Sequence, residues 1–283
     1  MRTALLTTVA MLAFAGNSLL ARVALRDTAI DPVSFTTLRL AGGALALWAI
    51  VRWRDGPAAA RRPAAGSWVS AAALFAYAAL FSLAYVWLSA ATGALLLFGA
   101  VQATMLATGI ARGERLSPLQ IAGLACALGG LLALLAPGLA APPPLAAAAM
   151  IAAGAAWGVY SLRGAQGADP TAATAGNFVR SVPFAALASL AALPWASVDA
   201  PGAGYALASG IVTSGLGYSV WYTALGGLRA SAAATVQLSV PAIAAVGGVL
   251  LLSEPASLRL VGASIAVLGG IAVVVLARPG TRR

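Results

Sequence analysis

The acidic, histidine and cysteine side chains are the residues of this sequence most able to move protons or hold metals. Histidine is absent, and the single cysteine, Cys126, lies inside an apolar run. The seven acidic residues all stand at or beyond the ends of apolar runs: Asp27, Asp31, Asp55, Glu114, Asp169, Asp199 and Glu254. A zinc or haem site needs ligands that this inventory lacks, so we expect no metal and no cofactor.

Polar and aromatic side chains recur at intervals of three and four residues inside several apolar runs, which places them on shared helix faces. An amide without a partner in hydrocarbon costs on the order of several kcal/mol. Asn17, Gln102 and Gln237 should therefore line a cavity or bond another helix, and the aromatic residues should pack or face the same cavity. We assign to substrate binding Asn17, Tyr77, Tyr85, Phe98, Gln102, Trp157, Tyr160, Ser214, Tyr218, Trp221 and Gln237.

Two arginines, Arg39 and Arg180, also fall inside apolar runs. Both are near enough to an end of the run to extend their charged heads toward water, and this is the expected arrangement. The alternative is that one faces a substrate carboxylate, Arg180 more readily than Arg39. Glu114 and Glu254 are expected to cap helices or form ion pairs.

Several classes of catalyst are disfavoured by the same inventory. The sequence contains no GxxxxGK[ST] phosphate loop, which argues against ATP hydrolysis by that route. It contains no GxSxG and no paired carboxylates within a run, so the nucleophile and base of an intramembrane enzyme cannot be assembled. Coupling to protons through a buried carboxylate is likewise unsupported.

The composition identifies the solvent that must surround these residues. Hydrophobic residues make up 61% of the chain and charged residues 8%, with a mean hydropathy of +0.93. Soluble proteins carry about 25% charged residues, so we predict a protein of the lipid bilayer. All 17 basic residues are arginines placed mostly between apolar runs, and the net charge of +10 therefore indicates membrane topology rather than nucleic-acid binding.

A membrane-spanning helix needs about 20 apolar residues, and Gly, Pro and Arg clusters mark where the runs end. The sequence predicts an all-α integral membrane protein of ten spans: Thr3–Ala24, Pro32–Val51, Gly66–Trp87, Ala91–Ala111, Pro118–Ala136, Leu145–Arg163, Thr171–Trp195, Ala203–Leu225, Ala230–Leu252 and Leu258–Ala277. The first run lacks a convincing cleavage site and is interpreted as a true span rather than a signal peptide.

The chain is duplicated. Landmarks recur 138 to 140 residues apart, about half of its length: Asp31-Pro32 with Asp169-Pro170, Glu114 with Glu254, Gly123 with Gly262, and Gly129-Gly130 with Gly269-Gly270. The two repeats are predicted to occupy residues 1–137 and 138–283. Each holds five spans, an odd number, so the second enters the membrane from the opposite side and the repeats are inverted. The glycine pairs favour close helix packing, with a subunit contact as the alternative.

The arginines predict the orientation. With a cytoplasmic amino terminus, twelve arginines lie in cytoplasmic segments and three, Arg22, Arg26 and Arg259, lie outside. Positive residues favour the cytoplasmic side. Both termini are therefore predicted to be cytoplasmic.

These features together resemble the drug/metabolite transporter superfamily, and more narrowly its EamA-type ten-helix exporters. The resemblance rests on two five-helix halves, the Asp31-Pro32 pair followed by Arg39, the small residues leading to Pro241 and the terminal Glu254, and the glycine pairs of spans five and ten. One departure is that Gln102 stands in the first half where the second has Pro241. Known members include exporters of amino acids, among them an aromatic amino acid group, and carriers of nucleosides, sugars and other metabolites.

The resemblance implies a transporter of the bacterial inner membrane that works by alternating access around a cavity between the repeats, and not an enzyme. A wall of π-faces and amides with few fixed charges favours amino acids, including aromatic or apolar ones. Nucleosides, quaternary cations or other drugs as substrates, and a non-saturable channel, stay open as alternatives. The expected partners are a small-molecule substrate and lipid. A monomer suffices, the oligomeric state is left open, and Gly215, Gly217 and Pro241 are candidate flex points.

Overall fold

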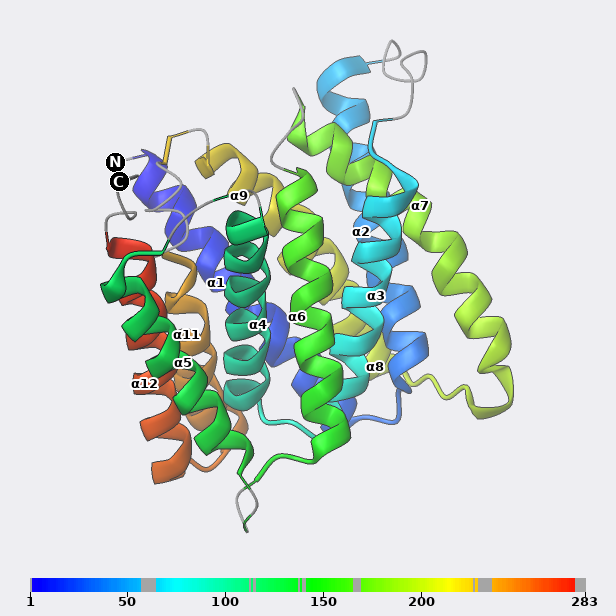
Figure 1. Cartoon of the computed structure of the whole chain (residues 1–283). Coiled ribbons are helices and arrows are strands. Elements are labelled where there is room, and N and C mark those ends of the chain that lie inside the picture. Colours follow the sequence, from blue (N-terminus) through cyan, green and yellow to red (C-terminus); the bar gives the residue numbers. More distant parts are fainter. Residues whose placement is uncertain are drawn as a thin grey trace.

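The computed structural model describes residues 2–56, 65–111, 113, 116–136, 138, 141–164, 169–225, 227–228 and 236–277. In these residues every regular element is a helix, and the helices form one bundle that α1 crosses obliquely (Figure 1). The elements are α1 (Arg2–Asp27), α2 (Pro32–Asp55), α3 (Trp68–Tyr85), α4 (Ala90–Ala111), α5 (Pro118–Leu135), α6 (Pro144–Gly164), α7 (Pro170–Ala191), η2 (Leu193–Trp195), α8 (Ala200–Ala208), η3 (Ser209–Leu216), α9 (Gly217–Leu225), α11 (Ser239–Leu252) and α12 (Leu258–Leu276).

The ten predicted spans correspond to α1 to α7, to the continuous run α8-η3-α9, to α11 and to α12. Among the described residues, α1 to α6 and α12 are each long and apolar enough to cross a membrane. Helix α11 is shorter, and Pro241 lies in its first turn rather than within a long helix. The first residues of the predicted ninth span, 230–235, lie outside the described ranges. The prediction of an all-α membrane protein with ten spans is confirmed.

Helices in equivalent positions of the two repeats begin in the same way. Asp31 caps α2 and Asp169 caps α7, while Ser117 caps α5 and Ser257 caps α12. Each of these side chains accepts a backbone N–H of the first turn at 2.8 to 3.3 Å. Such a cap contributes about 1 kcal/mol, and the proline that follows three of the four already has the helical φ angle. The duplicated Asp-Pro pair is thus a helix start.

The packing of the helices repeats the duplication. Helix α2 packs against its mate α7, and α5 against its mate α12. Helix α1 packs against the run α8-η3-α9, and its mate α6 packs in the equivalent way against α3. The amino-terminal end of α1 and the carboxy-terminal end of α12 lie at the same end of the bundle (Figure 1). Two sets of five helices with this pairing give an inverted arrangement.

The glycine pairs explain the close contact of α5 with α12. A Cβ atom on Gly123 would lie 2.6 Å from the carbonyl oxygen of Gly270, and one on Gly270 would lie 2.4 Å from that of Gly123. Gly130 is similarly confined, by Ala266. Small residues allow helix backbones to approach this closely in a membrane. One glycine of each pair therefore serves the packing within the chain.

The eighth span contains a π-helical segment, η3, between α8 and α9. A π-turn bonds each residue to the fifth along, which widens the helix and alters the faces that its side chains occupy. A Cβ atom on Gly210 would lie 2.1 Å from the carbonyl oxygen of Arg39, and one on Gly43 would lie 3.0 Å from that of Gly210. The absence of these side chains lets η3 press against α2 beside the centre of the bundle.

Candidate functional site

A small cavity lies where helices of both repeats meet. It is lined by Phe14, Asn17, Ser18, Tyr77, Phe81, Leu97, Phe98, Trp157 and Tyr218. These residues come from α1, α3, α4, α6 and α9. The cavity measures about 20 Å³, which is room for about one water molecule. This conformation is therefore contracted around the site, and an organic solute would need it to widen.

Aromatic rings form most of the cavity wall. The ring centroid of Trp157 lies 4.8 Å from that of Tyr77 and 5.0 Å from that of Tyr218. Phe14 meets the ring of Tyr218 edge-on at 5.8 Å. Aromatic pairs in favourable geometry, such as the edge-on pair of Phe14 and Tyr218, stabilise one another by about 0.5–1.5 kcal/mol beyond simple burial. Both repeats contribute a tyrosine to the wall, Tyr77 from α3 and Tyr218 from α9.

Asn17 supplies the polar part of the cavity. Its Nδ2 donates to Tyr77 Oη at 3.2 Å, and its Oδ1 accepts from Ser209 Oγ at 2.7 Å and from Thr213 Oγ1 at 3.3 Å. The amide thus joins α1, α3 and η3.

Arg39 is buried next to this network, with 1% of its surface exposed. Its Nε donates to Ser214 Oγ at 3.3 Å, and one terminal nitrogen donates to Tyr77 Oη at 3.0 Å. The guanidinium carbon lies 5.1 Å from the ring centroid of Tyr77 and 4.8 Å from that of Phe81. The expectation that Arg39 extends to water is wrong, because the backbone of η3 at Gly210 covers this part of α2.

Arg180 is placed differently. One of its terminal nitrogens donates to the backbone carbonyl oxygens of Ala65, at 2.6 Å, and of Gly176, at 3.0 Å. The side chain therefore joins α7 to the residues that precede α3. Its contacts with Ala65 and Gly176 are to backbone outside the cavity lining.

The predicted site residues fall into three groups. Those that line the cavity are Asn17, Tyr77, Phe98, Trp157 and Tyr218. Those that contact the lining residues, or Arg39, are Tyr85, Tyr160, Ser214 and Trp221. Gln102 and Gln237 are absent from the lining. Nine of the eleven positions therefore gather in one region of the bundle.

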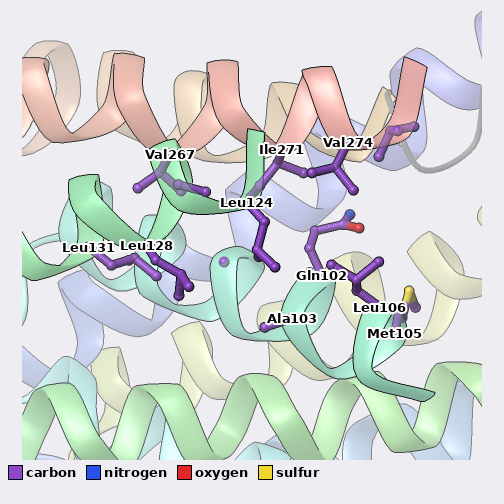
Figure 2. A pocket seen from close by; sticks show the side chains of 13 residues that line it. Gln102, Ala103, Met105, Leu106, Leu124, Leu128, Leu131, Val267, Ile271 and Val274 are labelled. Atoms are coloured by element: carbon purple, nitrogen blue, oxygen red, sulfur yellow. The ribbon is translucent and has the colours of Figure 1, made fainter. Parts of the chain in front are cut away.

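Gln102 faces a lateral groove rather than the central cavity. The groove lies between α4, α5 and α12, measures about 170 Å³ and is lined mainly by apolar side chains such as Leu124 and Ile271. Figure 2 shows the amide of Gln102 directed toward α12 near Val274. Its Nε2 is buried without a hydrogen-bond partner. Gln237 is buried just before α11.

The assigned set leaves out three lining residues that share helix faces with assigned ones, Phe14, Ser18 and Phe81. Four other residues near the cavity were also not assigned: Leu97, Phe178, Ser209 and Thr213. Leu97 lines the cavity, and Phe178 meets Tyr218 edge-on at 5.8 Å. Ser209 and Thr213 are four residues apart, a spacing that a search for small hydroxyl pairs in this span would have found.

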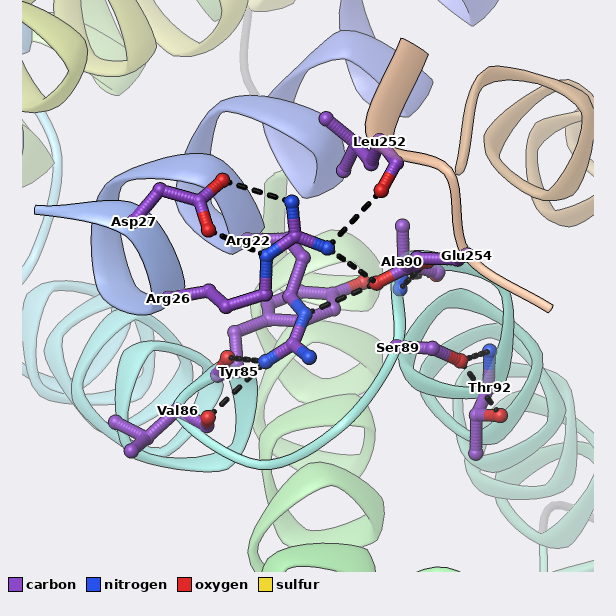
Figure 3. Close-up of polar contacts among 10 residues, drawn as sticks. All are labelled: Arg22, Arg26, Asp27, Tyr85, Val86, Ser89, Ala90, Thr92, Leu252 and Glu254. Atoms are coloured by element: carbon purple, nitrogen blue, oxygen red, sulfur yellow. Dashed lines mark hydrogen bonds and ion pairs between the residues drawn. The ribbon is translucent and has the colours of Figure 1, made fainter. Parts of the chain in front are cut away.

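An ion pair connects the two repeats close to the cavity (Figure 3). Arg22 Nε lies 3.0 Å from Glu254 Oε1. A terminal nitrogen of Arg22 donates to the carbonyl oxygens of Tyr85 and Val86, both at 3.0 Å, and Glu254 Oε2 accepts the backbone N–H of Ala90 at 2.8 Å. The prediction that Glu254 forms an ion pair is confirmed. Its counterpart Glu114 lies outside the described residues.

The ion pair stands one helical turn beyond the cavity lining. Arg22 follows Ser18 by four residues on α1, and Tyr85 follows Phe81 by four on α3, so the members of each pair share a helix face. Arg26, one turn further, donates to the carbonyl oxygen of Leu252 at 3.1 Å. We call Arg22, Glu254 and the backbone groups that they bind the end clamp.

Known proteins share the sequence pattern and the fold of this chain. The model of the EamA-like transporter family matches residues 1–136 and 144–276. A protein of Pseudomonas aeruginosa, described as uncharacterized protein PA1977, is 58% identical over 279 residues, which cover 99% of this chain and 96% of that protein. A crystal structure described only as that of a protein superposes with a TM-score of 0.66 at 22% identity, covering 96% of each chain, and shares the fold.

Proposed function

The chain belongs to the EamA-like transporter family, and from this we propose that it exports small organic metabolites, most of all amino acids with aromatic or apolar side chains. Membership makes it a multi-pass membrane transporter rather than an enzyme. The substrate class is our own inference. It rests on one observation, the aromatic cavity that both repeats build.

The wall of that cavity supports the choice of substrate. Phe14, Tyr77, Trp157 and Tyr218 present ring faces and edges, and Asn17 adds an amide. When the cavity widens, the rings of its wall lose contacts with one another. A planar or apolar side chain of the substrate would replace these contacts with equivalent ones to its own surface. Binding sites for small molecules are commonly built in this way, with apolar walls and a few directed polar groups.

Transport would proceed by alternating access between the repeats, which we place at residues 1–137 and 138–283. The end clamp joins Glu254 of the second repeat to Arg22 and Ala90 of the first. Its release would let the cavity widen toward that end, while its formation would close the cavity as seen here. Inverted repeats rock against each other in this manner around a central site.

The source of energy is proposed to be the gradient of the substrate itself. In the part of the chain that the structure describes, the acidic side chains stand at helix ends or in the connections between helices, and none lines the cavity. A proton relay would need such a group within the membrane. We place the protein in the bacterial inner membrane with both termini in the cytoplasm, so that the end clamp faces outward.

The test is counterflow of a radiolabelled amino-acid panel in proteoliposomes. The wild type should show saturable uptake of phenylalanine, tryptophan and leucine, unchanged by an imposed pH gradient. Trp157→Ala should lower apparent affinity about tenfold, because it removes an indole that the planar side chain of the substrate would contact, a pair worth about 0.5–1.5 kcal/mol. Trp195→Ala is the matched control, since Trp195 is 77% exposed.

Each other outcome leads to a different conclusion. Saturable transport of nucleosides or quaternary cations, with no amino-acid transport, would replace the substrate class. Flux that never saturates would indicate a channel. Amino-acid transport that survives Trp157→Ala unchanged would move the binding site away from the aromatic cavity.

A further inference from the structure

One guanidinium nitrogen of Arg39 has no hydrogen-bond partner. It is Nη1, and it is buried. The other two nitrogens donate to hydroxyl groups, one to Ser214 and one to Tyr77, and the phenol of Tyr218 also interacts with the guanidinium group. A guanidinium carries five N–H groups in a planar fork that fits a carboxylate, so part of this donor set is unused.

The charge of Arg39 is also without an acidic partner. The ion pairs of the described residues involve Arg22, Arg26 and Arg54, and none includes Arg39. Aromatic faces and hydroxyls offset part of the cost of burying a cation, but a buried charge is normally paired. The closed cavity therefore leaves a cation in the bundle for which an anion would be the natural partner.

The position of Arg39 connects it to the cavity. Tyr77 and Phe81, whose rings lie against the guanidinium, both line the cavity. Tyr77 Oη accepts from both Arg39 and Asn17, so it stands between the arginine and the cavity amide. A carboxylate that enters when the cavity widens could take the place of this hydroxyl and bind two N–H groups at once.

We propose that Arg39 binds the carboxylate of the transported solute, and that this carboxylate is required whereas an amino group is not. The proposal rests on the transport function proposed above and narrows its substrate class to monocarboxylates with an apolar or aromatic body. One cation suits one negative charge. Among the residues that the structure describes, no acidic side chain lines the cavity to pair with an ammonium group, and π-faces can accept one without requiring it.

The test compares carboxylates with their neutral amides on the same body. The probes are phenylalanine, phenylalaninamide, 3-phenylpropionate, 3-phenylpropionamide and phenethylamine. Binding is followed by thermal shift of the purified protein, and transport by competition with labelled phenylalanine counterflow. For the wild type we expect phenylalanine and 3-phenylpropionate to bind with similar affinity, and both amides and phenethylamine to bind at least tenfold more weakly.

Three variants locate the effect. Arg39→Met keeps a similar length without charge, and should reduce the carboxylate-to-amide ratio to near one. Arg39→Lys keeps the charge but lacks the planar set of N–H donors, so its carboxylate-to-amide ratio should be intermediate. Arg180→Gln, the matched control, should leave the ratio unchanged. The melting temperature of Arg39→Met without ligand should fall little, because the substitution also removes an incompletely paired buried charge.

The results distinguish failure of the carboxylate proposal from failure of the proposed transport function. Amino-acid transport with equal binding of acids and amides would overturn the carboxylate proposal and keep the transport function. Carboxylate binding that depends on Arg39, without any amino-acid transport, would keep the proposal and overturn the amino-acid function. If no probe binds to a folded wild-type protein, or if Arg39→Lys loses all ligand discrimination together with its fold, Arg39 is structural and the proposal fails.

Discussion

Breaking the end clamp should open the cavity toward that end. The substitution Glu254→Gln removes the charge that Arg22 meets at 3.0 Å, where the two side chains are 13% and 6% exposed. It keeps the shape of the side chain and one acceptor oxygen for the N–H of Ala90. The change therefore acts mainly on the attraction between the two repeats.

The magnitude follows from the surroundings of Arg22. Removing one partner of a fully buried pair costs about 3–5 kcal/mol. Arg22 keeps two carbonyl acceptors, on Tyr85 and Val86, and retains some contact with the surface, so a charge-assisted hydrogen bond of about 2 kcal/mol is the better measure. If the clamp forms only in the closed state, Glu254→Gln shifts the equilibrium toward the open state by about 30-fold, at 1.4 kcal/mol per factor of ten.

Cysteine labelling measures that shift. Ser18 lines the cavity one turn from Arg22 and is 1% exposed. Ser18→Cys is introduced after the native Cys126, which is exposed, has been replaced by alanine. The rate of reaction with a membrane-impermeant maleimide, applied from the side of the clamp, should rise about 30-fold in Glu254→Gln, in proportion to the open population.

The control variant for Glu254→Gln changes another arginine contact at the same end of the molecule. Arg259 begins α12 at the end of the bundle where Glu254 lies, but it binds the carbonyl oxygens of Ala133 and Ala136 instead of a charge. Arg259→Gln should leave the labelling rate at the wild-type value. An unchanged rate in Glu254→Gln, or an equal increase in both variants, would show that the ion pair does not hold the cavity closed.

Three further predictions concern the elements that shape the site. Gly210→Ala places a Cβ atom 2.1 Å from a carbonyl oxygen of α2 and should lower stability by about 1–3 kcal/mol, whereas Gly204→Ala, where nothing lies within 4 Å, should not lower the melting temperature in this way. Asn17→Ala leaves the buried hydroxyl of Ser209 without its acceptor and takes one of two partners from Thr213 Oγ1 and from Tyr77 Oη, so it should cost about 1–3 kcal/mol in chemical denaturation, a loss absent if water replaces the amide. Partial burial raises the pKa of Asp31, but hydrogen bonds from Ser34, Ser197 and Val33 outweigh it and hold the pKa below 3.8. The stabilisation from its ionised form is present above the ordinary pKa and lost as pH falls through the lowered one, so the melting temperatures of wild type and Asp31→Asn should differ most above about pH 4 and converge in stronger acid.

The spans, the helix starts and the inverted order could be predicted from the sequence because each depends on residues close together in the chain. Span lengths follow from the thickness of the bilayer, and helix starts follow from side chains next to them, such as Asp31 and Ser117, which bind the first turn. The inverted arrangement follows from counting spans between repeated landmarks. None of these steps requires knowledge of which helix lies beside which.

The features that the sequence did not predict depend on neighbours. Arg39 was expected to reach water from its depth in the span alone, but Gly210 lets η3 cover it. The π-turn itself changes the side-chain period in that span, so a search at 3.6 residues per turn misassigns its faces. Phe98 and Gln102 are four residues apart on α4, yet Phe98 meets the central cavity and Gln102 a groove beside α5 and α12.

The two repeats give the site a symmetric frame with unlike chemistry on its two sides. Tyr77 of α3 and Tyr218 of α9 both line the cavity, while Asn17 comes from α1 and Trp157 from its mate α6. The polar groups lie with α1, α2 and η3, while the indole comes from α6. A solute with one charged end and one planar end would therefore have a single favourable orientation, with its carboxylate toward α2 and its ring toward α6. A symmetric cavity would bind the solute equally well in either of its two orientations. Each end of such a cavity would need its own cation to bind the carboxylate. The mate helices α1 and α6 thus bring unlike side chains to the cavity, which would allow a duplicated scaffold to bind an asymmetric solute in one orientation.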